Sequence, residues 1–145
     1  MEQGVNVREI EISVLGNEQP MVSVPGEIVA SNEFYDYKAK YIDNKSVSVI
    51  PADIPADITA KIKALAVETY QALDCEGFSR VDFFIDRDNG NIYLNEVNTL
   101  PGFTEISMYP KMWEAAGLSY DKLLAKLIEL AEERFADRAK NSIDC

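Results

Sequence analysis

The chain has 145 residues, of which 47% are hydrophobic and 27% charged, and its formal net charge is −11. This length and composition predict one folded domain, residues 1–145, and exclude a disordered chain. The negative charge argues against a nucleic acid or an anionic membrane as partner, since both would require a basic face.

The residue types that are rare also narrow the chemistry. The sequence contains no histidine, which excludes Ser-His-Asp catalysis and histidine-ligated metals. The two cysteines, Cys75 and Cys145, are far apart in sequence, as is typical of a reducing compartment. No apolar run approaches the about 20 residues of a membrane-spanning helix, and no signal peptide is recognisable. We therefore expect a cytoplasmic protein.

The first part of the chain predicts strands. Residues 7–15 (VREIEISVL) alternate between apolar and polar side chains, which predicts a half-buried strand. A second strand is expected over residues 21–30, interrupted at Pro25-Gly26, and a third over residues 45–50. Between them, residues 31–44 are rich in aromatic residues without a clear period, so we expect either a covering loop or part of an interface.

The second part predicts helices around a hairpin. Apolar residues at helical spacing predict a helix over residues 55–74, followed by strands at 78–85 and 91–97. Helices are expected over 110–116 and 120–136, with a frayed tail at about 137–145. The buried stripe of the last helix is expected to be Leu123, Leu124, Leu127, Ile128, Leu130 and Ala131. The predicted class is α+β, a mostly antiparallel sheet with helices on one face.

The hairpin carries the residues that suggest chemistry. Arg80 and Asp82 share one face of the first strand, because side chains alternate along a strand, and Glu96 and Asn98 share one face of the second. A hairpin centred on Asn89 would place Asp82 opposite Glu96 and Arg80 opposite Asn98. Two carboxylates in that position repel each other, and an all-oxygen donor set favours a hard cation such as Mg²⁺.

Three other interpretations of these acids compete with a magnesium site. A calcium-binding loop starting at Asp86 is rejected, because Gly90 and Glu96 each fall one position short of the places that the loop requires. A pair of glycosidase carboxylates is disfavoured, because nothing else in the chain indicates a sugar cleft. A solvent-exposed hairpin face without function fits the spacing as well as a metal site does, so these residues alone leave that choice open.

Longer motifs connect the hairpin to a known family. The segments SRVDFF, YLNEVNTLPGFT and SMYPKMWEAAGLSY resemble the C-terminal part of D-alanine–D-alanine ligases, which belong to the ATP-grasp superfamily. The resemblance extends back through VPGEIVASNEFYDYKAKY and REIEISVLG, and forward to about Arg134. It implies the C-terminal subdomain of an ATP-grasp fold. It also implies ATP-dependent joining of two D-alanines through an acyl phosphate, for peptidoglycan synthesis.

The resemblance also implies roles for individual residues. Asp82, Glu96 and Asn98 would bind two Mg²⁺ ions, with Mn²⁺ as an alternative. Arg80 and the Gly102 N–H would stabilise the oxyanion, and Ser107 and Met108 would hold the carboxylate of the second D-alanine. Lys40 and Tyr41 match a mobile loop that closes over the site. The nucleotide would be contacted by Glu2, Gln3, Val5, Glu9, Phe84 and Asn95.

Complete ligases of this family also have an N-terminal and a central domain, which the resemblance does not cover. We therefore expect the chain to represent the part of the site that binds metal and stabilises the oxyanion. Alone it should bind ATP weakly and not ligate. Apolar surface left uncovered predicts a homo-oligomer. The alternative is a non-catalytic, self-associating folding unit of ligase ancestry.

Overall fold

A computed structural model of the chain describes residues 6–29, 47–104 and 106–140. The strands are β1 (Val7–Gly16), β2 (Met21–Val22), β3 (Gly26–Val29), β4 (Val47–Val49), β5 (Gly77–Asp86) and β6 (Ile92–Asn98). The helices are α1 (Ala56–Ala72), α2 (Met108–Ala115) and α3 (Tyr120–Lys140). Within these described ranges, none of the helices combines the length and the apolar character that crossing a membrane requires.

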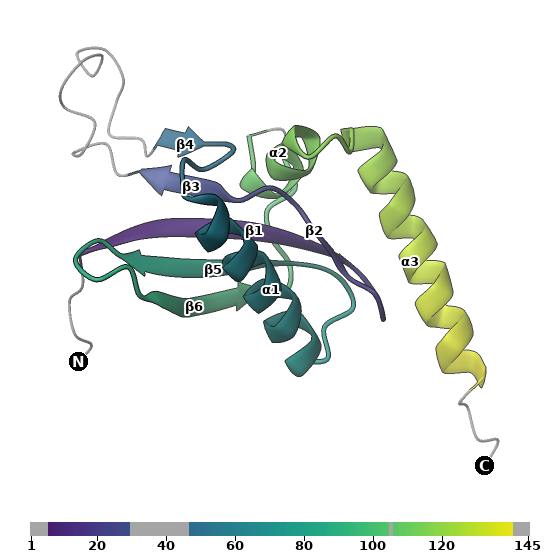
Figure 1. Cartoon of the computed structure of the whole chain (residues 1–145). Coiled ribbons are helices and arrows are strands. Elements are labelled where there is room, and N and C mark those ends of the chain that lie inside the picture. The colour runs from purple at the N-terminus through teal and green to yellow at the C-terminus, as the bar shows by residue number, and fades with distance from the viewer. Residues whose placement is uncertain (1–5, 30–46, 105, 141–145) are drawn as a thin grey trace.

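The strands form one antiparallel sheet in the order β4–β3–β1–β5–β6, with β2 paired to β1 (Figure 1). The two central strands, β1 and β5, pair along their whole length, from Val7 opposite Asp86 to Gly16 opposite Gly77. Because side chains alternate along both strands, this register assigns every second residue to the same face of the sheet. The α+β class and the antiparallel sheet are confirmed.

Helix α1 covers one face of the sheet. Ile10 and Ile12 of β1 and Phe83 of β5 pack in one cluster with Ile62 and Ala66 of α1, and all five are at most 1% exposed. The hydroxyl of Tyr70, also on α1, donates a hydrogen bond of 2.7 Å to the carbonyl of Gly16. This apolar face of the sheet is therefore closed by one helix.

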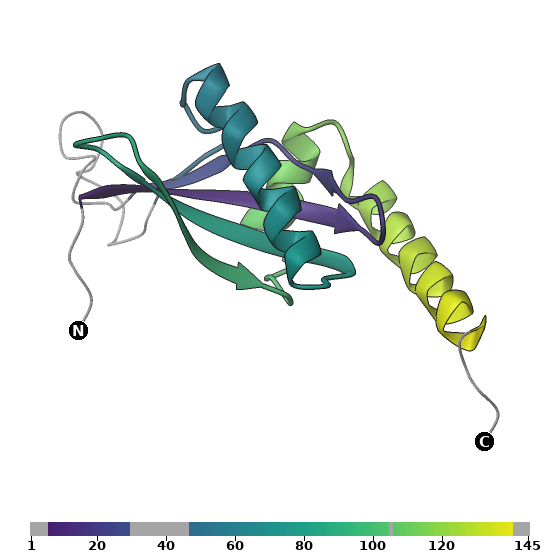
Figure 2. The ribbon, with the colours of Figure 1, turned by 60° about the horizontal axis from the view of Figure 1, so that its bottom comes forward.

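Helices α2 and α3 pack on the opposite face, as Figure 2 shows for α2. Leu15 of β1, Tyr109 and Trp113 of α2 and Leu123 of α3 belong to a second buried cluster. The hydroxyl of Ser13, on the same face as Leu15, donates to the carbonyl of Tyr109 at 3.2 Å. The expectation that all helices lie on one face was therefore wrong: β1 alternates buried residues toward both sides, so both sides need a cover.

The limits of the last two helices also differ from the expectation. Helix α2 begins at Met108, two residues before Pro110; proline is tolerated there because the first turn of a helix has unpaired N–H groups. Helix α3 continues to Lys140, beyond the predicted end at residue 136, and residues 141–145 lie outside the described part. It runs past the edge of the sheet (Figure 1) and buries only Leu123 and Leu130.

Three residues expected in the buried stripe of α3 are instead exposed: Leu124, Ile128 and Ala131. Leu124 is 40% exposed and Ile128 is 63% exposed. The stripe was read from spacing alone, and spacing does not reveal how far the neighbouring elements extend. The helix extends past the sheet (Figure 1), so part of its apolar side has no partner among the described residues.

Truncation of a buried isoleucine tests this assignment of the core. Ile62→Ala should lower the free energy of unfolding by about 2–4 kcal/mol, because it leaves a cavity between α1 and the sheet. Ile128→Ala on α3, a matched control, should change it by less than about 0.5 kcal/mol. Urea unfolding of both variants at low protein concentration measures the difference. Equal losses would contradict the described core.

Candidate functional site

The face of the sheet that carries α2 also carries a row of acidic residues. Strand pairing places Glu11 of β1 opposite Asp82 of β5, and Asp82 opposite Glu96 of β6. The opposition of Asp82 and Glu96 expected from the hairpin is confirmed, as is that of Arg80 and Asn98. Glu11 is 5% exposed and Asp82 is 2% exposed, so two of the three carboxylates are buried.

A bulge in β6 changes which side chains of this strand point to each face of the sheet. Asp82 pairs with Glu96 and Phe83 with Leu94, which leaves Asn95 as an extra residue without a partner. Without the bulge, Leu94 and Glu96 would point to the same side. With it, Leu94 lines an apolar groove with Leu65 of α1, whereas Glu96 faces the acidic row. Nothing in the sequence pattern of residues 91–97 predicts this bulge.

Arg80 places a positive charge beside the acidic row. Its Nε and one terminal nitrogen donate to the two carboxylate oxygens of Asp82, at 2.8 and 2.7 Å. The same Nε lies 3.4 Å from Oε2 of Glu11. The hydrogen bond to Asp82, with the nearby carboxylates of Glu11 and Glu96, raises the pKa of Arg80 above its ordinary value. The guanidinium therefore stays charged and lies between two acids.

The positive charge of Arg80 alone does not balance the carboxylates around it. Burial, together with the charges of Asp82, Glu9 and Glu96, raises the pKa of Glu11 to about 7, although Arg80 opposes the shift. Burial and the charges of Asp82 and Glu96 also raise the pKa of Glu9. Oε2 of Glu11 is buried and has no hydrogen-bond partner. The described part of this face therefore carries more negative charge than Arg80 balances, which favours binding of a further cation beside the acidic row.

The donor set fits a magnesium ion that takes part of its ligands from a phosphate. Among the described residues, no three carboxylate, cysteine or histidine side chains are arranged to hold a metal by themselves. Mg²⁺ in phosphate-transferring sites commonly uses one or two carboxylates and fills its shell with water and phosphate oxygens. Asp82, Glu96 and Asn98 supply oxygen donors on one face, and the Asn98 side-chain oxygen is held by the N–H of Leu100 at 3.1 Å.

The corner after β6 leads into α2. Oγ of Ser107 accepts a hydrogen bond from the N–H of Thr104 at 3.0 Å. A Cβ built on Gly102 would lie only 3.0 Å from this Oγ. The backbone of Gly102 is not left-handed, so this close approach is the feature of the corner that favours a residue without a side chain. The side chain of Met108 is buried against Gly26, so only its backbone N–H can serve a ligand.

The residues expected around a nucleotide are only partly described. Glu9 pairs with Phe84, and Phe84 with Tyr93, so all three lie on the face of the acidic row. Asn95 is the bulge residue of the neighbouring strand and is exposed. The other expected site residues lie outside the described part of the chain: Glu2, Gln3, Val5, Lys40 and Tyr41.

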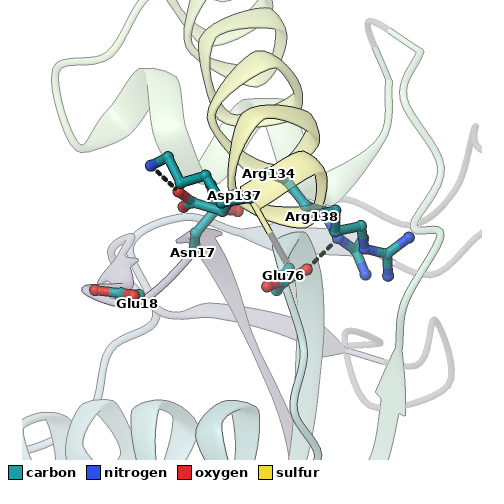
Figure 3. A pocket seen from close by; sticks show the side chains of 7 residues that line it. Asn17, Glu18, Glu76, Arg134, Asp137 and Arg138 are labelled. Atoms are coloured by element: carbon teal, nitrogen blue, oxygen red, sulfur yellow. Dashed lines mark hydrogen bonds and ion pairs between the residues drawn. The ribbon is translucent and has the colours of Figure 1, made fainter. Parts of the chain in front are cut away.

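A second cleft lies between the turn after β1 and the last turns of α3 (Figure 3). Arg134 of α3 forms an ion pair with Glu76 across it. The side chain of Asn17 donates to the carbonyl of Leu130 at 3.0 Å and accepts from the N–H of Gly77 at 3.1 Å. These contacts tie α3 to the sheet, which gives the cleft a structural role.

Comparison with known proteins shows which family shares this sequence. A family model described as "D-ala D-ala ligase C-terminus" matches residues 1–129. The chain belongs to the D-alanine–D-alanine ligase family. The D-alanine–D-alanine ligase of Clostridium acetobutylicum is 58% identical over 134 residues, which are 92% of this chain and 39% of that protein. The chain thus spans well under half the length of the curated ligases that it matches.

Solved ligase structures share the fold. The D-alanine–D-alanine ligase of Coxiella burnetii superposes with a TM-score of 0.82 at 40% identity, covering 96% of this chain and 36% of that one. The ligase of Bacillus anthracis, solved in complex with ATP, gives a TM-score of 0.78 at 32% identity, with 94% and 43% coverage. These neighbours confirm the ATP-grasp ligase fold expected from the motifs.

Glu11 belongs to this candidate site by position, although no sequence motif points to it. In the alternating pattern of residues 7–15 it is one of the polar positions, as are Glu9 and Ser13, and the pattern assigns it no role. The signal that could have identified it is the length match between β1 and β5, because full pairing of the two strands aligns Glu11 with Asp82. The pairing of β1 with β5 joins segments far apart in the sequence. The rules for short hairpins, which align Asp82 with Glu96, do not predict it.

The raised pKa of Glu11 predicts a pH-dependent stability for the metal-free chain. The folded protein binds a proton that the unfolded chain releases near pH 4.5, so this stabilisation is complete below that pH and is lost as the pH rises through about 7. The loss should be on the order of 2–3 kcal/mol. Glu11→Gln should remove most of this pH dependence in urea unfolding with EDTA present.

The exposed Glu114 on α2 offers a control for the same charge loss. Glu114→Gln should retain the full decrease in unfolding free energy between pH 5 and 7.5. A Glu11→Gln variant whose stability follows the same pH curve as the parent chain would disprove the assignment.

Proposed function

We propose that this chain carries the magnesium-binding and oxyanion-stabilising part of the site of an ATP-dependent D-alanine–D-alanine ligase. In this reaction the γ-phosphoryl group of ATP is transferred to the carboxylate of one D-alanine, giving an acyl phosphate and ADP. The amine of the second D-alanine then attacks the acyl carbon, forms the amide bond and releases phosphate. The observation that carries the proposal is the opposition of Asp82 and Glu96 beside Arg80, within a chain of this family.

Asp82, Glu96 and Asn98 would hold the metal, two Mg²⁺ ions or Mn²⁺ in their place. Bound there, the ions supply neutralisation of the phosphate charge and alignment of the transferring group. The protein contributes donors fixed by the sheet: Asp82 is buried on a central strand, and the Asn98 amide oxygen is held by the N–H of Leu100. Rigid donors need little reorganisation during the reaction, which lowers the barrier.

The neighbouring groups would handle the oxyanion and the second substrate. Arg80 remains charged beside the acids, and the Gly102 N–H lies at the exposed corner after β6. Both can donate to the oxygen that becomes negative as the amine attacks. At the N-terminus of α2, the N–H of Ser107 already donates to the carbonyl of Thr104 at 2.9 Å. The hydroxyl of Ser107 and the N–H of Met108, at the first position of the helix, would therefore hold a carboxylate such as that of D-alanine.

For the nucleotide, Glu9 would accept hydrogen bonds from the ribose, and Phe84 and Asn95 would lie under the adenine. Phe84 and Glu9 share the face of the acidic row, so a nucleotide bound over them would direct its phosphates toward Asp82. Glu2, Gln3 and Val5 are proposed to contact adenine, Lys40 the γ-phosphate, and Tyr41 to exclude water. A cytoplasmic location, where ATP is available, is part of the same proposal.

The proposal is tested by restoring the rest of the ligase. Joining this chain to the portion of the Clostridium acetobutylicum ligase that it does not cover gives a chimera, whose D-alanine-dependent phosphate release can be measured. The chimera should be active, and Glu96→Gln or Arg80→Met should lower kcat by roughly 100-fold or more, because each removes charge stabilisation of the transition state.

Asp88 provides the matched control, since it lies on the same hairpin but in its exposed turn. Asp88→Asn should leave phosphate release within about twofold of the parent chimera, because surface substitutions away from special contacts have small effects. A folded chimera without activity, or one insensitive to Glu96→Gln, would favour the alternative of a non-catalytic folding unit.

The self-association expected from the sequence remains a prediction, and the exposed side of α3 supports it. Ile128 and Phe135 are 63% and 77% exposed, and Leu124 lies one turn before Ile128. Sedimentation velocity should show a dimer or larger species at high protein concentration. Ile128→Ser with Phe135→Ser should shift it to monomer, because the apolar stripe is removed. Leu73→Ser, an exposed residue of a different element, is the control.

A clean monomer of the parent chain at high concentration would contradict the prediction. So would an oligomer that persists in the Ile128→Ser, Phe135→Ser variant but dissociates in the Leu73→Ser variant.

A further inference from the structure

Arg80 and Asp82 are both required by the proposed site, yet they occupy each other in this structure. The guanidinium of Arg80 donates to both carboxylate oxygens of Asp82, at 2.8 and 2.7 Å. Asp82 has to offer oxygen to a cation, and a cation at that position repels the guanidinium. Arg80 therefore needs a second anion nearby if it is to remain at the site.

Glu11 is placed to be that anion. It lies on the neighbouring strand directly opposite Asp82, and its Oε2 is 3.4 Å from Nε of Arg80. The same Oε2 is buried and has no hydrogen-bond partner, although the residue is only 5% exposed. A buried carboxylate oxygen without a partner destabilises the fold, so stability alone does not account for a glutamate here.

We propose that Glu11 is a positioning residue, which holds the guanidinium of Arg80 against the sheet when the Asp82 carboxylate serves a divalent cation. Glu11 itself contacts neither substrate nor cation. Its orphaned oxygen becomes the acceptor for Nε of Arg80, and Asp82 is released from competition with the guanidinium. The inference rests on the proposed function, because it takes Asp82 as a metal ligand.

The test is a Mn²⁺ titration of the complete chain, followed by electron paramagnetic resonance of the free ion. Four proteins form a cycle: the parent chain, Glu11→Gln, Arg80→Met and the double variant. Glu11→Gln should weaken Mn²⁺ binding by roughly tenfold in the parent background, because Arg80 then pairs with Asp82 alone. In the Arg80→Met background the same change should have at most a twofold effect.

Glu9→Gln is the matched control, since Glu9 is on the same strand and the same face, two residues away. It removes the same charge, so its effect on Mn²⁺ affinity should be equal in both Arg80 backgrounds. Glu11→Asp retains the charge with a shorter side chain and should restore part of the affinity. Circular dichroism of each variant verifies that it is folded.

The outcomes separate this inference from the proposed function. An effect of Glu11→Gln that is equally large with and without Arg80 would mean a general charge effect and would overturn the positioning role. No effect in either background would overturn it as well. Failure of the proposed function has another signature: Asp82→Asn and Glu96→Gln would then leave Mn²⁺ affinity unchanged.

Discussion

The alternation of side chains along β5 is the constraint on which the rest of the structure depends. Val81 and Phe83 point toward α1 and close the apolar core, whereas Arg80 and Asp82 point to the opposite face. Because β5 pairs on both sides, with β1 and with β6, it fixes which residues of these strands share a face. A slip of one residue would bury the charges under α1 and remove the site together with the core.

The face of the sheet with the acidic row is the energetically unfavourable one, because carboxylates are buried there. It is tolerated because α2 leaves part of this face uncovered. Helix α2 covers only part of this face, through Tyr109 and Trp113. Among the described residues, the acids beyond that cover share one arginine, Arg80, and Oε2 of Glu11 has no hydrogen-bond partner. Proteins commonly retain such unfavourable arrangements where a ligand completes them. The phosphate-bound divalent cation of the proposed function would supply positive charge to this face.

Local rules were sufficient where neighbours in sequence decide the structure. The turn after Asp86 placed Asp82 opposite Glu96, since a hairpin leaves few choices of register. The motifs around the hairpin identified the family and most of the candidate site. Local rules failed where contacts between distant segments decide the structure. Glu11 joins the candidate site because β1 pairs with β5, and Ile128 is exposed because α3 extends past the sheet. The role of Gly102 also depended on a contact, with Ser107.

The sequence by itself determined the strands, the helices, the family and the opposition of Asp82 and Glu96, because each follows from periodicity or from a short turn. Only the tertiary structure decided that helices cover both faces of the sheet and that β6 carries a bulge at Asn95. It alone placed Arg80 between Asp82 and Glu11. The physical reason is that these features depend on contacts between segments far apart in the chain. The alternation of side chains within one strand does not predict which residues of another strand lie opposite them.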